Sequence, residues 1–401
     1  MDFQTTAAIV FAVLLAVLLY FNRKKLDTKF LVPYFIYFSM YKTRVGLGLM
    51  DSAAKKFRKT AVYIGYFGIF VGFLGMAFIA FGLIKNIFTF FAKPQAAQGV
   101  GLVLPFPGKG IFYVPFFYWI ISIFVILIVH EFAHGLIARA HNIRVKSSGL
   151  AFVGIIIPLL PGAFVETDEK QSQKRPHSQQ LSIFAAGPLA NMITAFVFLA
   201  LALLVLAPIL NAAIEPNGVK VADFVKGNFT YPAENSGIKI GESIQQIDGI
   251  ETPYTDNLSR ALHSKKPGDV VAIKTDKSDY QVKLAKNPDN ESLAYMGAYL
   301  EQDTKIKDSV KSVYGEFLPN AAEWFFVLFI TLFTLNLGIG LFNLVPIGPL
   351  DGGRMLLLPL QKYFGEETGK KIWVYVGLIF LIIIAINIGA PFGLLNFLKL
   401  K

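Results

Sequence analysis

Two histidines four residues apart, with a glutamate directly after the first, form the most chemically distinctive pattern in the chain. They are His130, Glu131 and His134, within the sequence HEFAH. On an α-helix, residues four apart share a face, so both imidazoles can reach one metal ion. Glu131, next to the first ligand, can take a proton from a water molecule that the metal activates. The pattern therefore predicts a hydrolytic zinc site.

The sequence around this motif is apolar, with WII at 119–121 and VILIV at 125–129. Ionisable side chains inside a membrane span are costly and mark function by default. A metalloprotease that carries its HExxH motif in a cytoplasmic domain does not fit these surroundings. Since the chain has no cysteine, a transition metal must be bound by imidazole and carboxylate groups.

Two histidines require a third ligand, and the candidate is Asp351, within NLVPIGPLDGG at 343–353. Pro346 and Pro349 break the helix there, and broken backbone at membrane depth is typical of a cavity wall. A helix-capping Asp in an interfacial loop is the alternative. Asn343 could donate a hydrogen bond to a substrate carbonyl or its developing oxyanion, or instead join two helices.

Two further intramembrane amides are interpreted as structural. Asn336 lies seven residues before Asn343, and a hydrogen bond between helices is the expected role. The run AAGPLAN, which ends at Asn191, is rich in small residues and predicts close helix packing.

The composition indicates a membrane protein. Of the 401 residues 54% are hydrophobic and only 16% are charged, against about 25% charged in soluble domains. The apolar residues form runs of about 20, long enough to cross a bilayer. Six spans are expected, at about 5–20, 61–84, 112–141, 181–210, 318–345 and 372–388. The formal charge of +11 lies largely between these spans, so the lipid bilayer rather than nucleic acid is the expected partner.

The charge distribution predicts the orientation. The connector at 23–59 is rich in Lys and Arg, which places it in the cytoplasm. Both termini and the polar stretch at 213–312 then lie outside the cytoplasm. We expect a multi-pass cell membrane protein of a prokaryote.

Residues 148–165, SGLAFVGIIIPLLPGAFV, could form either a span or a membrane-dipping hairpin. Gly and Pro argue against an unbroken helix, whereas Ile155, Ile156 and Ile157 suit a strand. Basic residues on both sides favour a re-entrant β-hairpin or loop. A full span would invert everything downstream.

The expected fold is thus a multi-span α-helical membrane protein with one re-entrant β-hairpin and an inserted small α/β domain. Residues 1–110 hold two helices and the basic connector, and 111–211 hold core spans with HExxH and the hairpin. Residues 212–312 form the soluble domain, where 270–274 and 280–284 read as strands. Residues 313–401 hold the last core spans with the LDG motif.

HEFAH in one span and NLVPIGPLDGG in a later one together resemble the site-2 protease family of intramembrane metalloproteases. The resemblance covers roughly residues 112–388. It implies that His130, His134 and Asp351 bind one zinc ion, that Glu131 is the catalytic base, and that Asn343 assists the substrate or transition state. Transmembrane proteins would be the substrates.

Two further segments share the resemblance. AAGPLAN is similar to the family's second core span, and GAFVE at 162–166 is similar to its loop and strand beside the active site. PAENSGIKIGESIQQIDG at 232–249 resembles a PDZ domain. It could bind a peptide, a clipped substrate or a substrate ectodomain, act as a size filter, or serve only for docking.

Two other classes of membrane protein are alternatives. A non-catalytic membrane adaptor could bind peptides through the PDZ-like domain, but it has no use for Glu131 beside two metal ligands. A transporter also uses broken helices, but it does not need the HExxH spacing.

Overall fold

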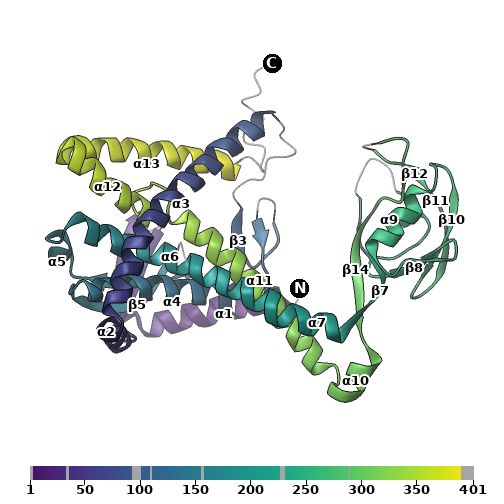
Figure 1. Ribbon diagram of the computed structural model, residues 1–401, viewed down its shortest axis with the longest axis horizontal. Helices are drawn as coiled ribbons and strands as arrows, with labels where there is room; N and C mark the ends of the chain where they lie inside the picture. The colour runs from purple at the N-terminus through teal and green to yellow at the C-terminus, as the bar shows by residue number, and fades with distance from the viewer. Residues whose placement is uncertain are drawn as a thin grey trace. The chain divides into compact units, whose positions relative to one another are not determined.

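The computed structural model describes residues 3–32, 36–92, 101–108, 111–154, 158–225, 231–288 and 290–389. It divides into two compact units (Figure 1). The first unit contains residues 1–202 and 327–401, and the second contains residues 203–326. The second unit thus includes the predicted soluble range together with the helix ends that flank it. Each unit has a hydrophobic core of its own.

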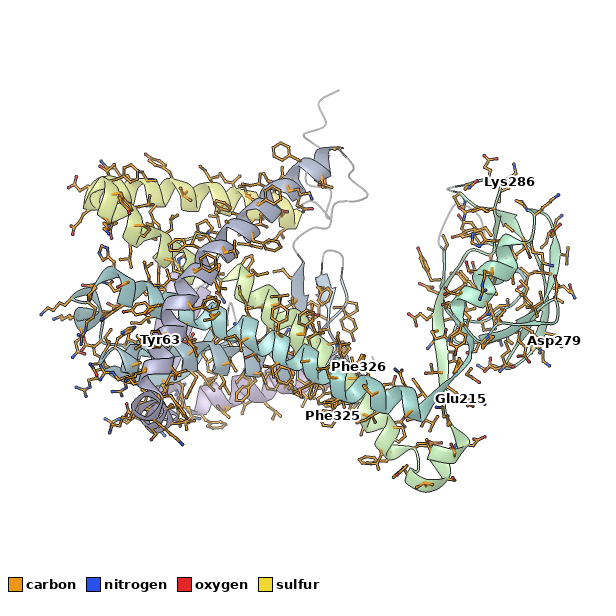
Figure 2. All side chains as sticks on the ribbon, viewed as in Figure 1. Tyr63, Glu215, Asp279, Lys286, Phe325 and Phe326 are labelled. Atoms are coloured by element: carbon orange, nitrogen blue, oxygen red, sulfur yellow. The ribbon has the colours of Figure 1, made fainter. Side chains whose placement is uncertain are left out.

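Six helices in the described residues are long and apolar enough to cross a membrane, as the sequence predicts. They are α1 (Phe3–Phe21), α3 (Arg58–Ala92), α4 (Phe116–Ala140), α6 (His177–Leu201), α11 (Phe317–Phe342) and α13 (Glu366–Gly389). Many of their apolar side chains point away from the protein. Tyr63 of α3 and Phe325 of α11 are 74% and 46% exposed (Figure 2). A helix satisfies its own backbone hydrogen bonds, so such a surface can face lipid.

Three helix ends differ from the sequence prediction. α4 begins at Phe116 rather than near 112, because Pro115 occupies its N-cap position. α6 continues through a π-turn (Ala202–Leu206) into α7 (Ala207–Ala213). α11 ends at Phe342, and the chain then turns into α12 (Asp351–Phe364), which the sequence analysis did not foresee.

Within the first unit, α6 packs against both α3 and α4, and α13 packs against α3 and α12. Short pieces complete this unit: a 3-10 turn (Arg23–Lys25), α2 (Leu47–Lys56), α5 (Glu169–Gln173), and the parallel strands β3 (Leu102–Leu104) and β4 (Ile111–Tyr113). The indole Nε1 of Trp119 donates to the carbonyl of Val103 at 3.0 Å, and this bond ties β3 to α4.

The ambiguous stretch at 148–165 forms an antiparallel hairpin and not a helix. Its strands are β5 (Val145–Gly154) and β6 (Pro158–Thr167). Pro and Gly interrupt helical hydrogen bonding here, whereas extended backbone accepts them at strand ends and edges. The predicted strand at Ile155, Ile156 and Ile157 lies outside the described residues.

The hairpin belongs to a larger sheet that the sequence analysis missed. A second hairpin, β1 (Leu26–Val32) and β2 (Ile36–Thr43), pairs with it in the order β1-β2-β5-β6. The connector was interpreted only through its positive charge, although its aromatic residues are typical of strands. β6 is the outer strand of this sheet beside α4.

Polar contacts join all four strands of this sheet. Lys42 Nζ of β2 lies 3.3 Å from Asp27 and 3.5 Å from Glu166 of β6. The Ser147 hydroxyl of β5 donates to Glu166 at 2.6 Å. This hydrogen bond, together with the Lys42 charge, holds the pKa of Glu166 below its usual range. The first hairpin is therefore tied to the strand nearest α4.

The second unit is an α/β domain around one apolar core. Its sheet has the order β11-β10-β8-β7-β14, with β9 pairing with β8. Leu258 and Ala261 of α9 are buried against this sheet, with Val219, Ile244 and Ile273 in the same core. The strands are β7 (Ile214–Phe224), β8 (Ser243–Ile247), β9 (Ile250–Glu251), β10 (Val270–Thr275), β11 (Asp279–Lys283) and β14 (Ala298–Ile306). The other elements are α8 (Pro232–Asn235), α9 (Thr255–His263), α10 (Asp308–Tyr314) and the ribbon of β12 (Ala285–Lys286) with β13 (Ala294–Tyr295).

A partly buried pair of amides links α3 to α13 and generates a first prediction. Asn86 Nδ2 donates to Asn387 Oδ1 at 2.6 Å, and Asn387 Nδ2 donates to the carbonyls of Ile383 at 2.8 Å and Leu83 at 3.3 Å. Asn387→Leu should lower the free energy of unfolding by about 1–2 kcal/mol, because hydrogen bonds between membrane helices contribute on that scale.

The measurement is the unfolding midpoint in detergent, taken for Asn86→Leu, Asn387→Leu and the double variant. If the amides act as a pair, the double variant loses less stability than the two single variants lose together. Fully additive losses would show that the two side chains do not interact.

Candidate metal centre

Three side chains from two helices converge at one point in the first unit. His130 and His134 lie on α4, and Asp351 is the first residue of α12. The two Nε2 atoms are 3.1 Å apart, and Asp351 Oδ2 lies 3.1 Å from His130 Nε2 and 3.3 Å from His134 Nε2. Ligand atoms on a tetrahedral zinc ion, each about 2.0–2.1 Å from the metal, are about 3.3–3.4 Å apart. The three atoms therefore match the spacing that one zinc ion requires.

Hydrogen bonds on the far side of each imidazole orient the ligand atoms. His134 Nδ1 lies 2.6 Å from the carbonyl oxygen of Ile183 in α6. A carbonyl only accepts, so Nδ1 carries the proton and Nε2 keeps a free lone pair for the metal. The helix that packs beside α4 thus selects the tautomer of one ligand.

Asn191 of α6 plays the same part for the other histidine. Its amide nitrogen lies 3.1 Å from His130 Nδ1, and its Oδ1 is buried without a hydrogen bond among the described residues. A 180° rotation of the amide turns Oδ1 toward Nδ1. Metal binding at Nε2 requires a proton on Nδ1 and therefore selects that rotamer. The sequence analysis assigned Asn191 to packing and did not foresee this contact.

Gly187 of α6 leaves the space that the two imidazoles occupy. A Cβ atom at this position would lie 2.5 Å from His134 Nε2 and 2.6 Å from His130 Nε2. Contacts this short are sterically forbidden, so only glycine brings α6 close enough to orient both histidines. The role of the AAGPLAN run is therefore packing against the candidate metal site itself.

The break between α11 and α12 carries Asp351 to the histidines. The N–H of Gly352 donates to the carbonyl of Asn343 at 2.8 Å, and the N–H of Leu350 donates to Ile347 at 2.9 Å. A Cβ at Gly352 would overlap the backbone of Leu344. The prolines end the helix, and the glycine lets the chain fold back on itself, so that α12 begins with its carboxylate at the metal position.

Glu131 is held by the outer strand of the four-stranded sheet. The backbone N–H of Val165 in β6 donates to Glu131 Oε2 at 2.8 Å. This N–H therefore points from the outer edge of the sheet, away from β5. The carboxylate is thus fixed beside the metal ligands, as a base acting on a water molecule must be.

One cavity of about 270 Å³ joins these groups. It is lined by the five residues that the sequence predicts to bind the metal or to act in catalysis, namely His130, Glu131, His134, Asn343 and Asp351. Phe164, Val165 and Arg354 also line it. Arg354 was missed, although its position three residues after Asp351 places it on the same face of α12.

Asn336 does not line the cavity. Its amide nitrogen donates to the carbonyl of Leu332 in its own helix at 2.7 Å, and Oδ1 has no partner among the described residues. The expected bond to another helix is therefore not seen in that part of the chain.

We predict that Gly187→Ala removes the bound metal. The new Cβ must displace one or both imidazoles, so zinc content measured by elemental analysis should fall from about one ion per chain to near zero. Gly82→Ala is the matched control, because a Cβ at that glycine of α3 meets nothing within 4 Å. Full zinc content in Gly187→Ala would mean that α6 does not constrain the histidines.

The contact between β6 and Glu131 gives a second prediction. Val165→Pro removes the N–H that reaches Glu131 but breaks no ladder bond to β5. Zinc content should be retained, while hydrolysis should fall about 10- to 100-fold because the base is no longer oriented. Val165→Ala keeps the N–H and should remain active. Equal activity in both variants would show that this hydrogen bond is dispensable.

Comparison with known proteins agrees with this geometry. Residues 118–384 match the family described as peptidase family M50. An uncharacterized protein of Methanocaldococcus jannaschii is 26% identical over 94% of this chain and 93% of its own. The regulator of sigma-W protease RasP of Bacillus subtilis is 24% identical over 54% of this chain and 59% of its own.

Two shorter likenesses concern parts of the chain. The regulator of sigma-E protease RseP of Salmonella typhimurium is 28% identical over 37% of this chain and 36% of its own. A PDZ domain of an SdrC-like protein from Listeria monocytogenes is 27% identical, covering 21% of this chain and 86% of its own with a TM-score of 0.18. The family match spans HExxH, the glycine of α6 and the LDG aspartate, and this chain is therefore a member of peptidase family M50, the site-2 protease type of zinc metalloprotease.

Proposed function

We propose that this protein is a zinc-dependent endopeptidase that hydrolyses peptide bonds in or near transmembrane segments of other membrane proteins. The observation that carries the proposal is the convergence of two imidazoles and a carboxylate at 3.1–3.3 Å, with Glu131 in the same cavity. The helices that bring these groups together, or lead into them, are long and apolar enough to span a bilayer.

In this proposal His130, His134 and Asp351 hold the metal. When bound, zinc acts as a Lewis acid that polarises a carbonyl and lowers the pKa of water to about 7. Glu131 accepts the proton of the attacking water and returns it to the leaving amine. The Asn343 amide, on the wall of the same cavity, donates to the carbonyl oxygen as negative charge develops there.

The edge of β6 offers a way to hold an unwound substrate. Since the N–H of Val165 points away from β5, the alternation of an antiparallel strand turns the N–H and C=O of Ala163 to the same edge. An extended substrate segment could pair with this edge and satisfy backbone groups that its helix no longer satisfies. The scissile carbonyl would then lie beside Glu131.

The remaining assignments concern the rest of the chain. The basic residues at 23–59 support a cytoplasmic connector, with both termini and the inserted domain outside the cytoplasm. In the inserted domain β14 is the last strand of its sheet, and this edge supports binding of a peptide or a substrate ectodomain. The division into residues 1–110, 111–211, 212–312 and 313–401 remains a prediction.

The deciding experiment compares wild type with Glu131→Gln in cleavage of a single-span membrane substrate. We expect the variant to keep its zinc and to lose about 10²- to 10⁴-fold in cleavage rate, because the amide cannot accept a proton. Glu323→Gln, an exposed position on α11, is the control and should cleave as wild type does.

Equal cleavage by wild type and Glu131→Gln would remove Glu131 from the mechanism. Zinc binding without cleavage of any membrane substrate would favour the non-catalytic adaptor, which uses the inserted domain to bind peptides.

A further inference from the structure

A second cavity, of about 490 Å³, lies apart from the metal ligands and is strongly basic. Its wall contains four cationic side chains and one carboxylate. These are Lys55, Arg58, Arg139, Arg144 and Asp51. Arg139 Nε lies 2.9 Å from Asp51 Oδ1, so this carboxylate already has a cation beside it. Within the described part of the chain, the other three cationic side chains form no ion pair.

Hydrogen bonds place this cavity at the ends of two membrane helices. α3 begins at Arg58 and α4 ends at Ala140, and Arg58 Nε donates to the carbonyl of Ala140 at 3.0 Å. Both helices are long and apolar enough to cross the bilayer. The point where their ends meet therefore lies at the level of the lipid headgroups.

The short helix α2 borders the cavity and has an apolar surface of its own. Leu49 of α2 is exposed, as are Val45 before the helix and Phe57 directly after it. Lys55 of the same helix lines the cavity. Apolar and basic side chains side by side are typical of a helix that lies in the membrane interface. An acyl chain could thus contact this surface while a headgroup occupies the cavity.

Helix capping accounts for only part of this positive charge. Arg58 uses Nε to cap the C-terminus of α4, and Arg139 donates to the carbonyl of Val145 at 3.2 Å. Lys55 and Arg144 form no comparable side-chain bond among the described residues. Burial lowers the pKa of His141 and the charge of Arg175 lowers it further, with an added contribution from Arg58 of the cavity wall.

We propose that this cavity is a binding site for a phosphate group, presented by an anionic phospholipid of the surrounding membrane. Guanidinium groups match the geometry of phosphate oxygens. Basic pockets between membrane helices hold anionic headgroups in this way. The site is connected to catalysis through α2, because Met50 of α2 packs over Gly135, the residue that follows His134.

The test titrates the full-length protein in neutral detergent with phosphatidylglycerol or phosphatidylcholine and counts bound lipids by native mass spectrometry. Wild type should bind phosphatidylglycerol more tightly than phosphatidylcholine. Lys55→Gln with Arg144→Gln should weaken phosphatidylglycerol binding about 30-fold, since each cation near the membrane surface contributes about a factor of five.

The matched control is Lys170→Gln with Lys174→Gln, which removes two exposed charges from α5 and its C-cap. It should bind phosphatidylglycerol as wild type does, and both double variants should keep their zinc, which shows that they fold. Equal loss of phosphatidylglycerol binding in both double variants would show a general effect of surface charge and would overturn the proposal. If inorganic phosphate protects wild type but not the Lys55/Arg144 variant from heat, and lipids bind without preference, the cavity takes soluble phosphate and the lipid assignment is wrong.

Discussion

The meeting of His130, His134 and Asp351 is the constraint on which the first unit depends. Three groups that can carry charge lie between apolar helices, where an unpaired charge is costly. They are tolerable together because they face one another at 3.1–3.3 Å and a cation can occupy the centre. The surrounding helices are arranged to keep these three atoms in place.

Each neighbouring element supplies one part of that support. α6 approaches through Gly187, and its Ile183 carbonyl and Asn191 side chain orient the two imidazoles. The break after α11 brings the Asp351 carboxylate to the start of α12, and β6 orients Glu131 through the N–H of Val165. A hydrolytic site in a membrane also requires room for water and peptide. The irregular backbone supplies it, because such backbone is stable at membrane depth only where it lines a cavity.

The four-stranded sheet connects the candidate metal site to the first hairpin, β1 and β2. β6 contacts Glu131 at Val165, and the next residue of the strand, Glu166, is bound by Lys42 of the first hairpin. Residues 26–43 therefore help to position the strand beside the active site. On the same unit, the basic cavity joins α2 to the end of α4, the helix that carries both histidines. The helix that carries both histidines is thus in contact with the elements that border the basic cavity.

Much of the site could be predicted from the sequence, because its chemistry is local. The i, i+4 spacing places two histidines on one face of a helix, and apolar runs of about 20 residues predict the membrane spans. Proline and glycine at 343–353 predict the helix break that carries Asp351.

What the sequence could not show depends on contacts between distant segments. The pairing of β1 and β2 with β5 and β6, the Gly187 approach, the Asn191 contact and the Val165 hydrogen bond each join residues far apart in the chain. The residue types alone thus determined that a metal is bound within a membrane, whereas the packing of α6 and β6 decided which atoms face it, since orientation is a property of neighbours brought together only by folding.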